Sequence, residues 1–189
     1  KGCTITKIGN NGNIKNESNT AKQYGSIAGL IVVAQESTID IAYNRGTLED
    51  YSGLYMGGLT VNLIDTKLSN AYNAGEIVSN ALYTDDWRSY ISGITAIIDG
   101  DETTIENTYN IAKYNNKTQI QETCYANVLA YTQQENLNIT NTYTIKNGFK
   151  AILEYPDSEN HQISIKEKTK EEMKQQSTYS GFDFENIWK

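Results

Sequence analysis

Proline, histidine and cysteine are nearly absent from this sequence. Of its 189 residues, one is Pro, one is His and two are Cys. A catalytic site of the Ser-His-Asp or Cys-His type would have to use the single histidine, His161. Neither Cys3 nor Cys124 belongs to a C-x-x-C pair, so the pattern supports neither a zinc site nor a dithiol redox site. No apolar run approaches the ~20 residues that a membrane-spanning helix needs, so we expect no membrane insertion.

Positive charge is also scarce. Lys and Arg together number 16 and Asp and Glu 23, which gives a net charge of −7 at pH 7. A general nucleic-acid-binding protein needs a basic surface to neutralise phosphates, so this class is excluded. The chain opens at Lys1 without Met or a signal peptide. We interpret it as part of a longer protein with other domains upstream, and the missing signal then says nothing about secretion.

The abundant residues favour strands and turns. Asn, Ile and Thr occur 21, 22 and 20 times, and Tyr 14 times. β-Branched and aromatic side chains favour strands, and Asn is frequent in turns. The composition therefore predicts a β-rich protein.

Internal repetition is the strongest signal in the sequence. A first element occurs four times, as residues 27–32, 56–61, 91–96 and 125–130. A second element follows each copy, as residues 39–44, 68–73, 105–110 and 139–144. A partial copy, from Ile5 to Gly12, precedes the first full repeat.

Apolar residues in both elements recur at every second position, as expected for strands. We predict that the first element buries three columns, which begin with Ala28, Leu30 and Val32. The second element begins with an apolar column at Ile39, Leu68, Ile105 and Ile139. Between this column and a column of tyrosines we expect an inward ladder of amides at Asn70, Asn107 and Asn141. A third set, Gly12, Gly46 and Gly75, is interpreted as turns with positive φ.

Strands that recur every ~30–37 residues without a helical pattern between them predict a solenoid. The expected fold is an all-β, right-handed parallel β-solenoid of about four coils, the handedness following the bias of parallel crossovers. Cys3 and Cys124 would then lie ~14–19 Å apart along the axis, because neighbouring strands are ~4.8 Å apart. A disulfide needs Cα atoms within ~7 Å, so we expect two thiols.

The C-terminal residues do not follow the repeat. We assign residues 1–161 to the β-solenoid and residues 162–189 to a C-terminal cap made of a strand, a short helix and an apolar tail. The helix is predicted from Thr169 to about Gln176, because Thr169 and Glu172 have the spacing of a capping box. The apolar residues of the tail are Phe182, Phe184, Ile187 and Trp188. A cap of this kind would cover the open strand edge of the last coil.

The sequence resembles the GLUG-motif repeats of bacterial surface and secreted proteins. The resemblance is carried by Gly57-Gly58-Leu59, by residues 69–77 (Ser-Asn-Ala-Tyr-Asn-Ala-Gly-Glu-Ile), and by the ending Gly181-Phe182-Asp183-Phe184 with Ile187-Trp188. Thr60 and Val61 depart from the pattern, and the fourth repeat lacks most of its glycines. The resemblance implies an extracellular β-solenoid module attached to other domains, and it implies no catalytic residues.

An insertion between the columns, residues 80–90, is the best candidate for ligand contact. Aromatic residues and Arg are enriched in binding hot spots, and the repeat does not explain their presence in this loop. The candidate ligand-binding residues are Tyr83, Asp85, Asp86, Trp87, Arg88 and Tyr90.

Acidic turns suggest a second possible site. Asp99, Asp101 and Glu102 cluster in one turn and are candidate ligands for calcium, which takes six to eight oxygen atoms. Asp40 and Glu106 are the acids at outward strand positions, two coils and so ~9.6 Å apart. A retaining glycosidase needs two carboxyl groups ~5–5.5 Å apart, so this pair does not fit.

Two further features have alternative interpretations. The tyrosine column could be a stacking platform for sugars, but its parity matches that of the Ile column, so we favour packing at a corner of the core. His161 could serve catalysis, but its polar surroundings favour an exposed loop residue.

The sequence therefore predicts a non-catalytic extracellular repeat module, at the cell surface or secreted, that acts in adhesion, ligand display or spacing. Its expected partner is a host or cell-surface protein or a glycan, with no cofactor except possible calcium. A carbohydrate-active β-helix enzyme, and an accessory domain of a larger surface hydrolase, are the alternatives.

Overall fold

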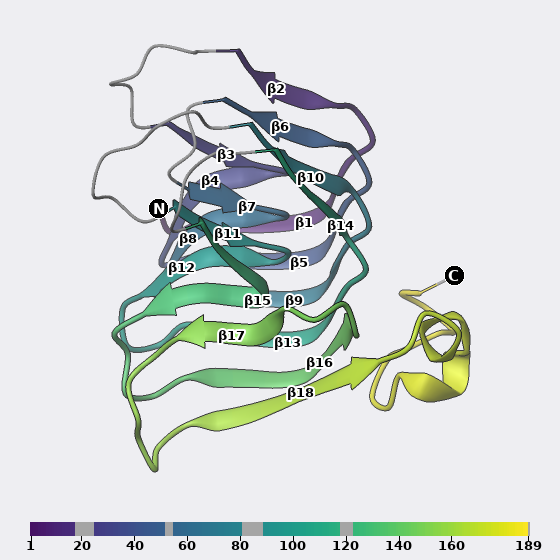
Figure 1. Cartoon of the computed structure of the whole chain (residues 1–189). Helices are drawn as coiled ribbons and strands as arrows, with labels where there is room; N and C mark the ends of the chain where they lie inside the picture. Colours follow the sequence, from purple (N-terminus) through teal and green to yellow (C-terminus); the bar gives the residue numbers. More distant parts are fainter. Residues whose placement is uncertain (18–24, 52–54, 81–88, 118–122, 189) are drawn as a thin grey trace.

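The computed structural model describes residues 1–17, 25–51, 55–80, 89–117 and 123–188 (Figure 1). Within these ranges the chain consists of β-strands and two short 3-10 helices. Every strand pair is parallel. The predicted all-β class with parallel sheets is confirmed.

A six-stranded sheet contains the copies of the second element. Its order is β1 (Thr4–Asn10), β5 (Thr38–Asn44), β9 (Lys67–Asn73), β13 (Thr104–Asn110), β16 (Asn138–Ile145) and β18 (Gln162–Lys168). In its register Ile39 pairs with Leu68, Leu68 with Ile105, and Ile105 with Ile139. Residues that occupy one column of the sequence alignment are therefore neighbours on adjacent strands.

Two further sheets complete the stack. The four-stranded sheet has the order β14 (Lys113–Asn116), β10 (Glu76–Ser79), β6 (Leu48–Asp50) and β2 (Ile14–Asn16). The eight-stranded sheet has the order β3 (Ser26–Ala28), β7 (Tyr55–Gly57), β11 (Ser89–Ser92), β15 (Thr123–Thr132), β12 (Thr95–Asp99), β8 (Thr60–Ile64) and β4 (Ile31–Gln35), with β17 (Lys150–Glu154) paired to β15.

The first element is bent in three of its four copies. β7 and β8 are separate strands with Gly58 and Leu59 between them, and the other bent copies are divided at the equivalent positions. A Cβ on Gly58 would lie 2.0 Å from the carbonyl oxygen of Gly93, between β11 and β12, so the close approach excludes a side chain. In the fourth copy Asn127 occupies the aligned position, and β15 runs through as one strand that pairs with both β11 and β12.

Because of this bend, the buried side chains of the first element belong to separate clusters. The largest cluster includes Leu59, Ile94 and Val128 together with the Ile39 column. Ala28, Val61 and Ala96 form a separate small cluster, and Val32 is 44% exposed. The prediction that all three columns are buried is confirmed except at Val32 and at the half-buried Leu30, although the outer two columns contribute to the separate small cluster.

Buried asparagines close the six-stranded sheet at the ends of its strands. Asn44 and Asn73 are fully buried, and the Nδ2 of Asn44 donates to the Oδ1 of Asn73 at 3.0 Å. Each Oδ1 also accepts the backbone N–H two residues later, that of Gly46 or Gly75. Neither glycine has a positive φ, so that prediction was wrong. A Cβ on Gly75 would lie 2.1 Å from the carbonyl oxygen of Gly46, so close stacking of the coils requires glycine.

The C-terminal segment begins as the expected capping box but does not form an α-helix. Thr169 Oγ1 accepts from the N–H of Glu172, and the Glu172 carboxylate accepts from the N–H of Thr169. The hydrogen bonds that the carboxylate accepts from the N–H and the hydroxyl of Thr169 and from Lys168 lower the pKa of Glu172 to about 2. Two 3-10 helices follow, η1 (Glu172–Lys174) and η2 (Gln176–Thr178). The predicted continuous helix was wrong, because Gln175 is extended (φ −99°, ψ 124°) and separates them.

Both cysteines are thiols, as predicted; Cys3 is exposed and Cys124 half-buried. Over the described ranges, no helix has the length and apolar character required to cross a membrane.

Candidate functional site

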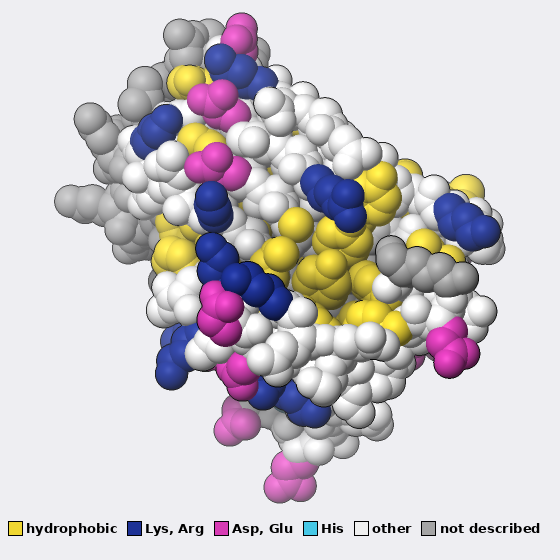
Figure 2. All heavy atoms as spheres, turned by 90° about the vertical axis from the view of Figure 1, so that its right-hand side faces the viewer, with side chains coloured by type: hydrophobic (Ala, Val, Ile, Leu, Met, Phe, Trp, Pro, Cys, Tyr) yellow, Lys and Arg dark blue, Asp and Glu magenta, His cyan; other side chains and the backbone are white. Residues whose placement is uncertain are grey.

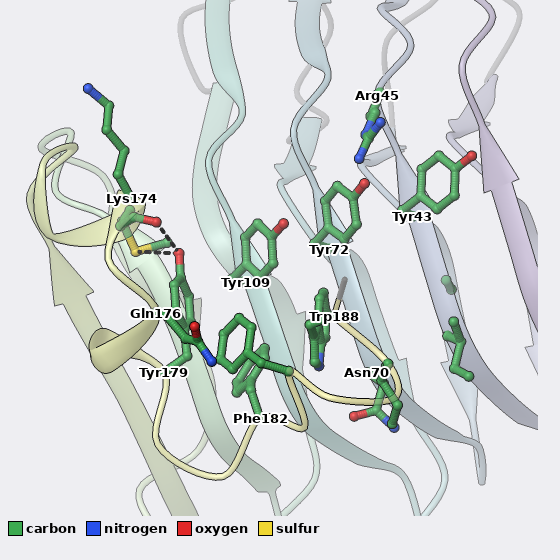
Figure 3. A pocket seen from close by; sticks show the side chains of 15 residues that line it. Tyr43, Arg45, Asn70, Tyr72, Tyr109, Lys174, Gln176, Tyr179, Phe182 and Trp188 are labelled. Carbon is green, nitrogen blue, oxygen red and sulfur yellow. Dashed lines mark hydrogen bonds between the residues drawn. The ribbon is translucent and has the colours of Figure 1, made fainter.

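A groove on the outer face of the six-stranded sheet is the candidate site (Figures 2 and 3). It depends on a local backbone feature that recurs in the strands. Five of the six strands contain one residue in the left-handed conformation, with φ of 58°, 56°, 50°, 50° and 46° at Lys7, Ile41, Asn70, Asn107 and Asn141.

This left-handed residue interrupts the alternation of faces along the strand. In β9, Leu68 and Ala71 are both buried although they are three residues apart, and Tyr72 is only half-buried. The tyrosine column therefore lies on the outer face, so the prediction that it packs at a corner of the core was wrong. The prediction assumed that side chains alternate strictly between the two faces of the strand. A left-handed residue between the Ile column and the tyrosine column shifts this alternation by one position.

The outward tyrosines form a stacked ladder. The ring centroids of Tyr43 and Tyr72 are 5.4 Å apart with an interplanar angle of 13°, and those of Tyr72 and Tyr109 are 4.8 Å apart at 4°. Figure 3 shows the three rings side by side on adjacent strands. The fourth member, Tyr143, is fully buried beneath the C-terminal segment.

An amide ladder runs beside the tyrosines. Asn141 donates to Asn107 at 3.2 Å, Asn107 donates to Asn70 at 3.3 Å, and Asn70 donates to Asp40 at 2.8 Å. The predicted ladder of hydrogen bonds is confirmed, but its inward orientation was wrong. All three amides are half-buried, and Asn70 lines the groove.

The C-terminal segment folds back over one half of the tyrosine ladder. Tyr179 lies 5.1 Å from Tyr143 and 5.5 Å from Tyr109 between ring centroids. Trp188 lies 5.4 Å from Tyr109 and 5.9 Å from Tyr72. The N–H of Ser180 donates to the hydroxyl of Tyr143 at 2.9 Å. These contacts leave the other half of the ladder, at Tyr43, beside an open cavity.

This cavity has a volume of about 470 Å³, within the ~300–1,000 Å³ typical of ligand pockets. The sheet contributes one wall and the C-terminal segment the other. Figure 2 shows apolar side chains gathered in a hollow, with Lys and Arg side chains on its border. The residues that line it from the sheet are Ile41, Ala42, Tyr43, Arg45, Asn70, Tyr72 and Tyr109, and those from the C-terminal segment include Lys174, Phe182, Ile187 and Trp188.

Arg45 supplies positive charge at the open end. Its guanidinium carbon lies 5.2 Å from the ring centroid of Tyr43 and 5.4 Å from that of Tyr72. Burial raises the pKa of Tyr72 and of Tyr109, although Arg45 opposes this effect in both. The phenols therefore stay neutral at physiological pH, and the groove combines apolar rings with a cation and no activated nucleophile.

The predicted ligand-binding loop is described only at its end. Tyr83, Asp85, Asp86, Trp87 and Arg88 lie outside the described residues. Tyr90 is half-buried in β11, where its ring stacks on Tyr55 at 6.1 Å and lies 5.2 Å from Tyr131. Its hydroxyl is 3.2 Å from a carboxylate oxygen of Glu154. Tyr90 thus belongs to a second column of aromatic rings on the eight-stranded sheet.

The predicted calcium ligands Asp99, Asp101 and Glu102 lie on an exposed turn. Asp99 accepts a hydrogen bond from the Asn62 amide at 2.8 Å. Asp101 and Glu102 border an open depression that also contains His161. In the part of the chain that the structure describes, no three Asp, Glu, His or Cys side chains group as a metal site. Calcium binding at this turn stays a prediction.

The remaining candidate residues, His161, Asp40 and Glu106, form hydrogen bonds or ion pairs with neighbouring residues of the protein. His161 is half-buried, not exposed; its Nδ1 accepts the N–H of Leu137 at 3.1 Å and its Nε2 lies 2.8 Å from the carbonyl oxygen of Pro156. This pattern assigns the proton to Nε2. Asp40 accepts from Ser69 and Asn70, and Glu106 forms an ion pair with Lys67. The structure does not place His161, Asp40 and Glu106 in one site.

Sequence reasoning missed the importance of Arg45 and of the C-terminal segment to the groove. The position of Arg45, two residues after Tyr43, was an available signal. The contact between the tail and the tyrosines is non-local and had no sequence signal.

No known protein family, no curated protein and no solved structure matches this chain.

Proposed function

We propose that this chain is a non-catalytic binding module of a bacterial surface or secreted protein, and that it binds through the groove on its tyrosine ladder. The observation that carries the proposal is the cavity of about 470 Å³ between stacked aromatic rings and a folded-back segment, with Arg45 at its open end. Clefts lined by aromatic side chains together with a few polar groups are typical of ligand sites. An exposed aromatic and Arg cluster is typical of binding hot spots.

The architecture that we propose for this module is a right-handed parallel β-solenoid of about four coils. The parallel register of the three sheets supports it, since successive passes of the chain add their strands in parallel to the same sheets. The resemblance to GLUG-motif repeats supports an extracellular location, with further domains upstream. The partner would be a host or cell-surface protein or a glycan, and the roles would be adhesion, ligand display or spacing.

The alternative functions are a carbohydrate-active β-helix enzyme and an accessory domain of a larger surface hydrolase. The positions of Asp40 and Glu106 disfavour a retaining glycosidase, because β9 separates the strands that carry them and the two carboxyl groups would have to lie ~5–5.5 Å apart. An assay for new reducing ends on a panel of polysaccharides tests it directly. Turnover that Glu106→Gln abolishes would replace the binding proposal.

A binding screen tests the proposed function. The protein is applied to immobilised host glycoproteins, glycans and peptides, and each positive result is repeated with Arg45→Glu and Tyr72→Ser. Tyr90→Ser is the matched control, because Tyr90 is also a half-buried, stacked tyrosine but lies on another sheet. Loss of binding in the groove variants alone is expected. Binding that only Tyr90→Ser abolishes would place the site on the eight-stranded sheet instead.

A further inference from the structure

The outer face of the six-stranded sheet presents one arrangement several times. Each copy consists of a tyrosine and the left-handed residue two positions before it, and register pairing places the copies side by side. Near each end of the tyrosine row a cation lies over a ring. Lys166 Nζ lies 5.6 Å from the ring centroid of Tyr143, and Arg45 lies over Tyr43 and Tyr72. The covered and the open halves of the groove are thus chemically similar.

The covered half shows which chemistry this face binds. Its occupant is the chain's own segment Tyr179–Trp188, whose aromatic rings contact the tyrosines. Its sequence alternates aromatic and acidic residues at Phe182-Asp183-Phe184-Glu185, but Asp183 accepts from the N–H groups of Glu185 and Asn186 in its own turn, so the preference for an acidic group rests on Arg45. Phe182 is 9% exposed and lies 5.7 Å from Tyr143. Gly181 passes so close to the amide ladder that a Cβ would lie 2.9 Å from the Asn141 amide nitrogen.

The open half of the groove has the same kind of tyrosine surface, but no described segment of the chain is bound to it. Among the described residues, no ring of the C-terminal segment stacks on Tyr43, and Arg45 forms no ion pair. Arg45 is exposed. Lys174 also lines the cavity, but its Nζ is already paired with the Glu171 carboxylate at 3.0 Å, so the available positive charge is that of Arg45.

Ring geometry favours a peptide over a sugar. Tyr43 and Tyr72 face each other at 13°, and a Cβ on Gly9 would lie 2.2 Å from the Tyr43 ring, which therefore also lies against the backbone of β1. Sugars pack on ring faces, and these faces are covered. The ladder presents ring edges, which suit edge-to-face contacts with another aromatic side chain. The tail already makes such contacts, at 62° and 72° to Tyr143.

We propose that the open half of the groove binds an acidic, aromatic-rich peptide segment of a partner protein. An aromatic side chain of the segment inserts between the Tyr43–Tyr72 edges and the Trp188 wall. A neighbouring carboxylate pairs with the Arg45 guanidinium, which is suited to bidentate contact. This inference rests on the proposed function and specifies the ligand class of the same groove.

The test uses the full chain and a fluorescein-labelled peptide that copies residues 179–188, measured by fluorescence anisotropy. Arg45→Ala is expected to weaken binding about tenfold, the loss typical of one charge-assisted pair. Lys15→Ala is the matched control, since Lys15 also lies over a tyrosine, 5.4 Å from the ring of Tyr51, but away from the groove. It should leave the affinity unchanged.

Two altered peptides test the chemistry of the segment. One replaces both Phe residues by Ala, and the other replaces Asp and Glu by Asn and Gln. Each is expected to bind more weakly than the parent, and the uncharged peptide should no longer distinguish wild type from Arg45→Ala. Melting temperatures of both protein variants within about 2 °C of wild type show that the folds are intact.

Other outcomes overturn the inference. Equal binding to wild type and Arg45→Ala would mean that the peptide only exchanges with the chain's own tail. Binding of an acidic oligogalacturonate, with none of the peptide, would make the ligand a glycan and leave the proposed function standing. Dimerisation in sedimentation that Arg45→Ala abolishes would make the occupant a second copy. If neither the peptide nor the oligogalacturonate binds, the inference is wrong. If no ligand binds in the screen of glycoproteins, glycans and peptides, the proposed function itself is wrong.

Discussion

Replacing Ile41 by Asn should stabilise the protein. Ile41 is β-branched and has a φ of 56°, whereas Asn70, Asn107 and Asn141 occupy the equivalent positions on later strands. The left-handed conformation costs ~1–2 kcal/mol for an ordinary residue and less for Asn, whose short side chain bonds locally. The Ile41→Asn amide would also extend the ladder beyond Asn70.

The loss of apolar contacts limits the gain. Ile41 is half-buried, so its removal costs roughly 0.5–1 kcal/mol, because each fully buried CH₂ contributes ~0.8 kcal/mol. The net stabilisation is about 1 kcal/mol, which raises the melting temperature by ~2–4 °C in a chain of this size.

Calorimetry of three variants measures this effect. Ile41→Leu keeps an apolar side chain without an amide and should show no comparable gain. The reverse change, Asn107→Ile, should lower the free energy of unfolding by about 2 kcal/mol, because it adds left-handed strain and breaks the ladder. An Ile41→Asn protein that melts at or below the wild-type temperature would refute the reasoning about the left-handed column.

Three further predictions concern the buried ladder, the tail and alkaline pH. Asn44→Ala should destabilise the protein by ~1–3 kcal/mol in urea unfolding, because it leaves buried backbone groups without partners; an unchanged midpoint would show that the ladder through Asn73 contributes nothing. A chain that ends at Lys168 should bind ANS and aggregate, because its tyrosine ladder is uncovered; a monodisperse product with unchanged ANS fluorescence would contradict this. Burial raises the pKa of Tyr125 and of Tyr179 to about 12. Between pH ~10 and ~12 the unfolded chain loses phenol protons that the folded chain retains, so stability should fall as pH rises through this window. If all 14 tyrosines ionise with a midpoint near pH ~10 while circular dichroism stays native, the raised pKa values of Tyr125 and Tyr179 are excluded.

Much of the fold could be predicted because parallel stacking places equivalent residues in one column. The Ile39, Leu68, Ile105 and Ile139 column is buried in the main cluster, as its alternation suggested. The thiol state of both cysteines also followed from strand spacing alone. In these cases one periodic rule held along the whole element.

The errors arose where that rule is interrupted. The left-handed residue of the second element shifts the alternation of faces, and it leaves no pattern in hydrophobicity. A column with Ile41 in the first full repeat and asparagine in the next three was an available signal for a left-handed position, because Asn tolerates that conformation.

The candidate site was less predictable because it depends on a contact between distant segments. The tail contacts tyrosines from strands up to about a hundred residues earlier, such as Trp188 on Tyr72. Local patterning carries no information on such a contact. The loop at residues 80–90 was predicted as the ligand-binding site because its aromatic residues are close to one another in the sequence.

The most direct test of the central claim is hydroxyl-radical footprinting of the protein by mass spectrometry, with and without a saturating groove ligand. The account predicts that Tyr43 is oxidised in the free protein and protected by the ligand, while Tyr143 is protected in both states. Protection of Tyr43 in the free protein, or a ligand footprint confined to another sheet, would contradict the claim that the open tyrosine ladder is the binding surface.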